Sequence, residues 1–384
     1  MLIKSLHVQN FRNHGDTRLV LSPGINVLVG DNAQGKTNLL EAIYLSCVGR
    51  GWRTNRDRDM IKFDAEVARV QTTTSKKFGD VDIQITLSRQ NKKAIKINDI
   101  PIQKMGELMG MVNCVFFSPD ELRLVKEAPA DRRRFMDIDI SQIDKSYFYA
   151  LMRYNKILAQ RNSLLKSHTE DIPRGLDIWD IELAKVGEVI IQKRINFLQR
   201  LKDAVTRTHG HLTDGKEAIS LSYESSVFEA SSLTQSPSKR QPNPPMNTLH
   251  FGDKEENELL KRLQSAREKD MRLRTTTVGP HRDDICITIN GKDVRHFASQ
   301  GQQRTVALSI KLAELEIFSE LTGEMPILLL DDVLSELDSN RQAKLLQSIK
   351  NCQSIITATD IDANFVNIEI FNIKHGKLLA DCST

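Results

Sequence analysis

The residues best suited to chemistry form one short run, Gly30-Asp31-Asn32-Ala33-Gln34-Gly35-Lys36-Thr37. Their spacing fits the phosphate-loop pattern G-x-x-x-x-G-K-S/T. The glycines let the backbone fold around a phosphate, so that its N–H groups point at the anion. In this pattern Lys36 reaches the β- and γ-phosphates of a nucleoside triphosphate, and Thr37 holds Mg²⁺. The run therefore predicts a nucleotide site.

The segments on either side of this run support the prediction. Residues 24–29 are apolar and β-branched, which is typical of a buried strand, and residues 38–45 have a helical pattern. A phosphate loop joins such a strand to the N-terminus of a helix, whose dipole favours an anion. We therefore expect the residues from Gly30 through Asn38 to contact the nucleotide.

A second candidate element is the apolar run from Pro326 to Leu330, which ends in Asp331 and Asp332. An acid at the end of a buried strand beside a phosphate loop coordinates Mg²⁺, directly or through water. Asp331 suits that role together with Thr37. Asp332 is placed to orient or deprotonate the attacking water. The alternative is a simple turn, and the phosphate loop favours the metal site. Lys36 and Asp332 are thus the predicted catalytic residues.

A third element is the helix predicted from Ser299 to Thr322. Ser299 and Gln302 fit a capping box, S-x-x-Q, and Gly323 is placed to end the helix. A helix that begins with Ser299 and Gly301 also offers its N-terminus to an anion. The two interpretations are compatible, because a bound phosphate can share the cap.

The bulk properties bound the function without defining it. The 384 residues are 40% hydrophobic and 27% charged, with a net charge of +4, as expected for two or three folded lobes. The mild positive charge permits nucleic-acid binding but does not demonstrate it. The five cysteines are scattered, which favours a reduced, intracellular protein. Neither a signal-peptide core nor a membrane-length apolar stretch is evident, so we expect a cytoplasmic location and no membrane.

The hydrophobic pattern divides the chain into three parts. Residues 66–100 predict antiparallel strands, whereas residues 120–213 predict helices that pack as an antiparallel pair, joined around Pro173 and Gly175. The segment 224–250 is rich in Ser, Pro and Asn and is predicted to be flexible. A charged helix is expected at 254–270. The predicted parts are the N-terminal head at 1–119, a helical arm at 120–272 and the C-terminal head at 273–384.

Clusters of arginine mark candidate contacts to a phosphate backbone. The loop at 50–58 carries four arginines and Trp52, and Arg132-Arg133-Arg134 follows later. Further cations are expected on the polar face of the arm: Arg153, Lys156, Arg161 and Lys166. An ordinary solvated surface explains such runs equally well. The sequence therefore leaves the path of a nucleic acid open.

With these stretches in hand, the sequence resembles the SMC-like branch of the ATP-binding-cassette ATPases, and within it the RecF family. Residues 6–13 (LHVQNFRN) are similar to the start of an SMC-type head. Four stretches are similar to the RecF family specifically: 117–122 (FSPDEL), 132–137 (RRRFMD), 277–284 (TVGPHRDD) and 299–307 (SQGQQRTVA). The motifs cover nearly the whole chain in the expected order.

The resemblance implies an α/β fold, an ABC-type phosphate-loop ATPase head with a short inserted helical arm. ATP and Mg²⁺ would be its cofactors. Ser299, Gly301 and Gln302 would belong to a signature that completes the ATP site of a second subunit, in an ATP-dependent homodimer. Residues 334–338 would cross the dimer interface. Many cassette ATPases have Glu where this chain has Asp332, so turnover would be slow, and Thr359 stands where transporter ATPases commonly have His.

The resemblance also implies an ATP-dependent DNA-binding protein of recombinational repair and replication-fork maintenance. Such proteins bind junctions of single-strand and double-strand DNA and, with RecR-like and RecO-like partners, promote RecA loading and support the SOS response. ATP hydrolysis would be weak, dependent on DNA, and used as a switch. The alternatives are a transporter-type ATPase subunit, another SMC-like DNA-binding ATPase, a phosphate-loop kinase, and an architectural DNA protein with a vestigial site.

Overall fold

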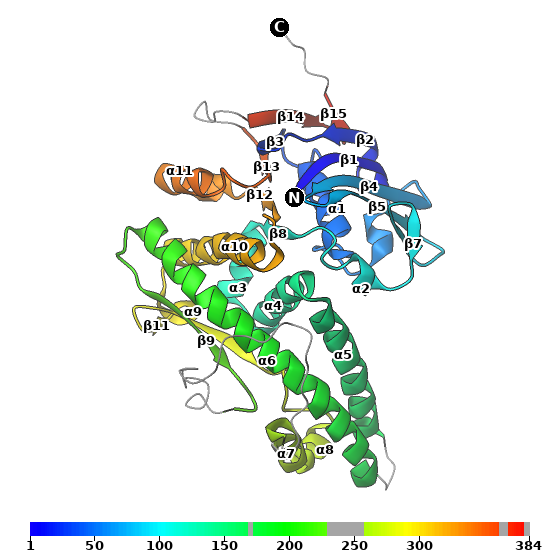
Figure 1. The fold of residues 1–384 in the computed structure, drawn as a ribbon, viewed down its shortest axis with the longest axis vertical. Coiled ribbons are helices and arrows are strands. Elements are labelled where there is room, and N and C mark those ends of the chain that lie inside the picture. The colour runs from blue at the N-terminus through cyan, green and yellow to red at the C-terminus, as the bar shows by residue number, and fades with distance from the viewer. Residues whose placement is uncertain (168–171, 229–256, 361–367, 380–384) are drawn as a thin grey trace.

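The computed structural model describes residues 1–167, 172–228, 257–360 and 368–379 (Figure 1). Its central sheet has six strands in the order β15-β14-β3-β13-β12-β8. All neighbours in it are parallel except β15, which pairs antiparallel at the edge. The bounds are β3 Ile25–Val29, β8 Cys114–Phe117, β12 Ile327–Asp331, β13 Ser354–Ala358, β14 Ile368–Lys374 and β15 Lys377–Leu378. The predicted α/β fold is confirmed.

The central sheet separates two hydrophobic cores. Because side chains alternate along a strand, Ile327 and Leu329 of β12 enter one core while Leu328 and Leu330 enter the other. The first core is closed by α1 (Lys36–Val48) and the second by α10 (Gln300–Thr322) and the arm. Burial on both faces explains why the strand reads as a continuous apolar run.

The first core also packs against an antiparallel sheet of order β2-β1-β4-β5-β6-β7. Its bounds are β1 Leu2–Phe11, β2 His14–Val20, β4 Val67–Lys76, β5 Gly79–Ser88, β6 Ala94–Ile97 and β7 Ile100–Ile102. The antiparallel strands predicted between residues 66 and 100 are confirmed. Short helices border this lobe and the central sheet: η1 Asp57–Met60, α2 Met105–Leu108, η2 Pro119–Leu122, α3 Arg123–Lys126, η4 Leu334–Glu336 and α11 Ser339–Ser348.

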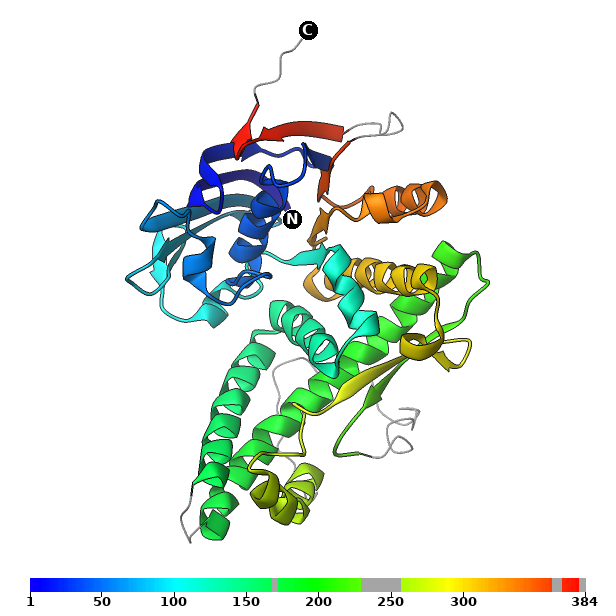
Figure 2. The ribbon, with the colours of Figure 1, turned by 180° about the vertical axis from the view of Figure 1, so that it is seen from behind.

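The arm extends away from both sheets as an antiparallel pair of long helices, α5 (Lys145–Lys166) and α6 (Ile172–Thr213) (Figure 1). Because α6 begins at Ile172, the predicted connection at Pro173 and Gly175 lies within its first turn, where proline is tolerated. Helix α4 (Pro129–Ile143) lies at the base of the arm. Helices α7 (Glu258–Ser265) and α8 (Arg267–Leu273) pack beside the far end of the pair (Figure 2).

One expectation for this region is revised. The helix predicted at 254–270 is two helices, which meet at Ala266, within its described part. The segment predicted to be flexible, 224–250, falls mostly outside the described residues. Its first residue ends β9 (Ile219–Glu224), which pairs with β10 (Asp284–Ile289) in a small sheet with β11 (Lys292–Asp293), followed by α9 (Val294–Phe297).

Two predicted surface cations are instead buried ion pairs. Arg161 is fully buried, and its guanidinium lies 2.7 Å from both Asp180 Oδ1 and Asp270 Oδ2. The Arg132 guanidinium donates hydrogen bonds to both carboxylate oxygens of Asp284, at 2.6 and 2.9 Å. The sequence pattern was misleading because the counterions come from distant parts of the chain. Neither arginine is therefore a candidate for contact with DNA.

Replacing Arg161 by alanine is expected to lower the free energy of unfolding by about 3–5 kcal/mol, because Asp270 would stay buried without its cation. Urea unfolding followed by circular dichroism measures the change. Arg153→Ala on the same helix is the matched control. Arg153 pairs with Glu182 in an exposed position, so its loss should cost no more than about 1 kcal/mol. Equal unfolding midpoints for the two variants would contradict the structural role of Arg161.

Candidate nucleotide site

The phosphate loop runs from Gly30 to Gly35, between β3 and α1. Two of its glycines are required by their surroundings. Gly35 has φ +110°, and a Cβ there would lie 2.6–2.7 Å from the side chains of Asn13 and His14. Gly30 has φ +154°, and a Cβ there would lie 2.3 Å from the Ile373 carbonyl oxygen. Any larger residue would displace the loop from β14 or β2.

Hydrogen bonds from other elements hold the loop in place. Asn13 donates to the Gln34 carbonyl at 3.1 Å and accepts from the Asn38 amide at 2.8 Å. The backbone N–H of Gly376, in the turn after β14, also donates to the Gln34 carbonyl, at 3.0 Å. Behind the loop, the buried His14 ring contacts the Gly35 carbonyl at 3.0 Å. The backbone that would face a phosphate is thus held by contacts with Asn13, His14 and Gly376.

Lys36 lies at the start of α1, and its side chain folds back over the loop. Its Nζ donates to the Gly30 carbonyl and, at 2.9 Å, to the Asp31 carbonyl. Burial lowers the pKa of Lys36, while the nearby carboxylates of Asp332, Asp31 and Asp331 act in the opposite direction. A partly desolvated ammonium group at this place is suited to a phosphate.

Asp331 lies at the carboxyl end of β12, where the parallel strands bring it to the phosphate loop. Its Oδ1 accepts hydrogen bonds from Thr37 Oγ1 at 2.6 Å and from Thr357 Oγ1 at 2.9 Å. Burial raises the pKa of Asp331, and these two hydrogen bonds oppose the shift. A carboxylate beside a hydroxyl offers the oxygen ligands that Mg²⁺ prefers, with the remaining positions left for phosphate and water. The side chains therefore fit a magnesium ion.

Asp332 has an unusual backbone that Thr357 supports. Its φ is +53°, in the left-handed region that few non-glycine residues adopt, although Asp and Asn do so more readily than most. Its N–H donates to Thr357 Oγ1 at 2.9 Å. Thr357, at the end of β13, thus connects both acids. Sequence reasoning missed it, because only the strand order shows that β13 lies between β3 and β12.

Most of these groups line one cavity of about 320 Å³, whereas Gly30, Asp31 and Asp331 are not among its lining residues. It is lined by Asn13, Asn32, Ala33, Gln34, Gly35, Lys36, Thr37, Asn38, Arg53, Asp332 and Thr357. Arg53 was grouped with the basic loop as a candidate DNA contact. The structure instead places its guanidinium 3.2 Å from Asn38 Oδ1 and 4.0 Å from Asp331 Oδ2. Arg53 therefore belongs to the nucleotide cavity, and no local signal in the sequence indicates this.

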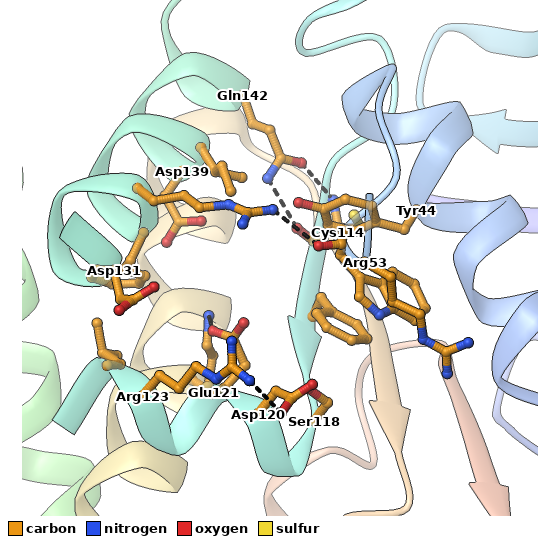
Figure 3. Close-up of a pocket in the computed structure, with 17 residues that line it drawn as sticks. Tyr44, Arg53, Cys114, Ser118, Asp120, Glu121, Arg123, Asp131, Asp139 and Gln142 are labelled. Atoms are coloured by element: carbon orange, nitrogen blue, oxygen red, sulfur yellow. Dashed lines mark hydrogen bonds and ion pairs between the residues drawn. The ribbon is translucent and has the colours of Figure 1, made fainter. Parts of the chain in front are cut away.

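A second cavity, of about 460 Å³, is also lined by Arg53 (Figure 3). On its head side, Trp52 stacks on Phe116 of β8 with ring centroids 4.0 Å apart. On its arm side, Arg134 of α4 donates a hydrogen bond to the Trp52 carbonyl at 3.2 Å. The loop that carries Arg53 is therefore held by both the central sheet and the base of the arm. This is a direct physical connection between the arm and the nucleotide site.

A buried charge cluster borders the same cavity. Lys311 of α10 lies 3.1 Å from Glu314 and 3.4 Å from Glu121 of η2. Asp139 of α4 is also buried there, and burial raises its pKa to about 7. The cluster joins α10, the segment after β8 and the base of the arm, so a displacement of any one of these would disturb the other two.

The predicted signature lies at the N-terminus of α10. The capping box is confirmed: Ser299 Oγ accepts from the Gln302 N–H at 3.3 Å, and Gln302 Oε1 accepts from the Ser299 N–H at 2.9 Å. Gly323 ends the helix with φ +73°. Ser299, Gly301 and Gln302 are absent from the lining of the cavity at the phosphate loop. Within one chain, the described structure does not bring them to the nucleotide site.

The fold and the site define a class, the phosphate-loop ATPase head with an inserted helical arm. Residues 2–371 match the family described as the RecF/RecN/SMC N terminal domain. The chain is 44% identical to the DNA replication and repair protein RecF of Clostridium botulinum (strain ATCC 19397 / Type A), over 94% of this chain and 93% of that protein. For the RecF of Clostridium perfringens (strain SM101 / Type A) the identity is 42%, over 98% and 99%. The chain belongs to the RecF family.

Solved structures agree with this assignment. A structure of the recombination mediator protein RecF with ATP in the RecFOR pathway superposes with a TM-score of 0.85 at 37% identity, covering 99% of this chain and 98% of that one. The Smc head domain of Pyrococcus furiosus, bound to the C-terminal domain of ScpA, reaches a TM-score of 0.55 at 18% identity over 98% and 96%, which shows a shared fold alone. No helix among the described residues is long and apolar enough to cross a bilayer.

Proposed function

We propose that this protein is an ATP-dependent DNA-binding protein of recombinational repair and replication-fork maintenance. It would bind DNA junctions between single and double strands and, with RecR-like and RecO-like partners, promote RecA loading and support the SOS response. One observation carries the ATP part: Thr37 of the phosphate loop and Asp331 of β12 meet at 2.6 Å beside a cavity that contains Lys36. The names of the relatives support the DNA part and give no support to a transporter subunit.

The chemistry follows from the groups around this cavity. Backbone N–H groups of residues 30–38 and the Lys36 ammonium hold the phosphates of ATP. Thr37 and Asp331 hold Mg²⁺, which when bound neutralises charge on the phosphates. Asp332 accepts a proton from the attacking water. We expect hydrolysis to be weak, because the Asp332 side chain is shorter than the Glu of many cassette ATPases and would lie farther from the attacking water. We also expect DNA to stimulate it.

The site is proposed to be completed by a second copy of the chain. Ser299 and Gln302 are partly or fully exposed at the N-terminus of α10, away from the phosphate loop of their own chain. A helix N-terminus attracts phosphate. In an ATP-dependent homodimer, the signature of each subunit would therefore cover the ATP of the other, with residues 334–338 at the interface.

The three-part division, 1–119, 120–272 and 273–384, remains our proposal for the functional domains. The two head segments combine in one nucleotide site, and the segment between them supplies the arm. A cytoplasmic location is the further expectation, since DNA repair takes place on the bacterial chromosome.

A titration of DNA with three nucleotide states tests this function. Gapped and blunt fluorescent duplexes are added to the full chain with ATP, with ADP or without nucleotide, and anisotropy reports binding. The expected result is tightest binding of the gapped duplex with ATP, accompanied by DNA-stimulated phosphate release. Binding that is equal in all three nucleotide states would contradict an ATP-dependent DNA switch.

A further inference from the structure

A cleft of about 670 Å³ lies between the head and the arm, and none of its lining residues lines the nucleotide cavity. Its head side is formed by the end of α1, by Lys93 and by α2. Its arm side is formed by α4, α5 and part of α6. Two arginine clusters that lie about 80 residues apart in the sequence converge here: Arg50 from the basic loop, and Arg133 and Arg134 from α4. The fold thus brings together two sets of cations that the sequence left separate.

Three arginines of the cleft form no ion pair with a carboxylate among the described residues. Arg50 is exposed and has no hydrogen-bond or ion-pair partner among the described residues. Arg133 and Arg134 donate to carbonyl oxygens, of Asp283 at 2.8 Å and of Trp52 at 3.2 Å, and not to carboxylates. Burial and the nearby Arg194 lower the pKa of Arg133, while the carboxylates of Asp284, Asp137 and Asp283 act in the opposite direction.

The acid that lines this cleft is already occupied. Asp137 is bound by Arg194 at 2.8 Å and by the Tyr147 hydroxyl. Lys93 is likewise neutralised, by Asp57 at 3.0 Å. The remaining charge is therefore carried by the three guanidinium groups of Arg50, Arg133 and Arg134, which suits a polyanion. Arginine is favoured for phosphate because its planar group donates several hydrogen bonds at once.

Apolar side chains line another part of the cleft. Phe148 and Met152 of α5 line it opposite Met105 and Met109 near α2, and Met152 is 58% exposed. Aromatic rings and polarisable thioethers are suited to the flat faces of nucleobases. Duplex DNA stacks those faces inside the helix and presents phosphates, sugars and base edges instead. A single strand presents phosphates and base faces together.

We propose that the cleft between α2 and α4–α5 binds a short stretch of single-stranded DNA. The phosphates lie against Arg50, Arg133 and Arg134, and the bases pack against Phe148 and Met152. The proposal rests on the proposed function and assigns its single-strand contact to one surface. Because Arg134 also holds the Trp52 carbonyl beside Arg53, a strand in the cleft would touch the loop that reaches the nucleotide cavity.

The test measures binding of a fluorescent oligothymidylate and of a blunt duplex of equal length to the full chain with ATP. The variants are Arg50→Glu and Met152→Glu, both at exposed positions outside the nucleotide cavity. Each is expected to weaken oligothymidylate binding about tenfold. Arg50→Glu should also reduce the slope of log affinity against log salt by about 0.7 for one lost phosphate contact. Duplex and ATP binding should stay unchanged.

Arg272→Glu is the matched control, because Arg272 is exposed on α8, outside the cleft, and the charge change is the same. It should leave oligothymidylate binding at the parental level. Parental affinity in both cleft variants, or a loss seen only with the duplex, would overturn the proposal. So would a polyglutamate peptide that binds the parent more tightly than oligothymidylate and loses this affinity in Arg50→Glu. If the parent with ATP binds no DNA at all, the proposed function itself fails.

Discussion

Replacement of Lys36 by alanine is expected to weaken ATP binding by about 10- to 150-fold, the range for loss of a hydrogen bond to a charged group. Lys36 Nζ lies over the phosphate loop, bonded to the carbonyls of Gly30 and Asp31, within reach of a bound phosphate. Dimerisation should be lost with ATP binding, because the nucleotide is proposed to join the two subunits. A fluorescent ATP analogue measures affinity, and light scattering after gel filtration with ATP measures the dimer.

Lys156→Ala is the control for this change, because Lys156 is an exposed lysine of α5 that lies outside the nucleotide cavity. It should bind ATP and dimerise as the parent does. Parental ATP affinity in Lys36→Ala would mean that the loop is not the nucleotide site. A dimer that persists in Lys36→Ala without bound ATP would leave the site in place and contradict ATP-dependent dimerisation.

The features that could be predicted are those set by neighbours in the sequence. The phosphate loop depends on glycines at fixed spacing, and the capping box of α10 joins residues three positions apart. The hairpin turn between β10 and β11 is similar, since Asn290 and Gly291 both have positive φ, as a tight turn demands. Each of these local structures requires particular residue types at fixed positions. The structure can therefore be predicted from the residues alone.

The features that could not be predicted depend on the order of strands in space. Thr357 supports both Asp331 and Asp332 only because β13 lies between β3 and β12. Arg53 enters the nucleotide cavity only because Trp52 is held between β8 and α4. These contacts join segments tens to hundreds of residues apart. A periodic pattern carries no information about which distant segment a side chain meets.

For some residues the sequence also gives the wrong prediction of whether the side chain is buried or exposed. Arg161 was expected to lie on the polar face of the arm, together with Arg153, Lys156 and Lys166. Arg161 can be buried only because Asp180 of α6 and Asp270 of α8 form ion pairs with its guanidinium. In β1, the register shifts between Ile3 and Ser5, so that Ile3 is fully buried where simple alternation favours Leu2. The burial of Arg161 and of Ile3 can be predicted only when the segment that packs against each residue is known.

The second large effect is expected at Asp332. Asp332→Asn should keep ATP affinity but lower the hydrolysis rate by about 10²- to 10⁴-fold, the usual contribution of a general base. Asparagine is the appropriate substitution because it keeps the shape and tolerates φ +53°. The hydrogen bond from the residue 332 N–H to Thr357 Oγ1 at 2.9 Å is made by the backbone and survives. The dimer formed with ATP should therefore persist longer.

Asp99→Asn controls for the backbone as well as for the charge, since Asp99 is an exposed acid with φ +64° that does not line the nucleotide cavity. It should hydrolyse ATP at the parental rate. Phosphate release measures turnover, and gel filtration at intervals after ATP addition measures the lifetime of the dimer. Parental turnover in Asp332→Asn would remove Asp332 from the catalytic assignment. Slow turnover with a dimer of parental lifetime would instead separate hydrolysis from dimer opening, and the ATP switch would need another trigger.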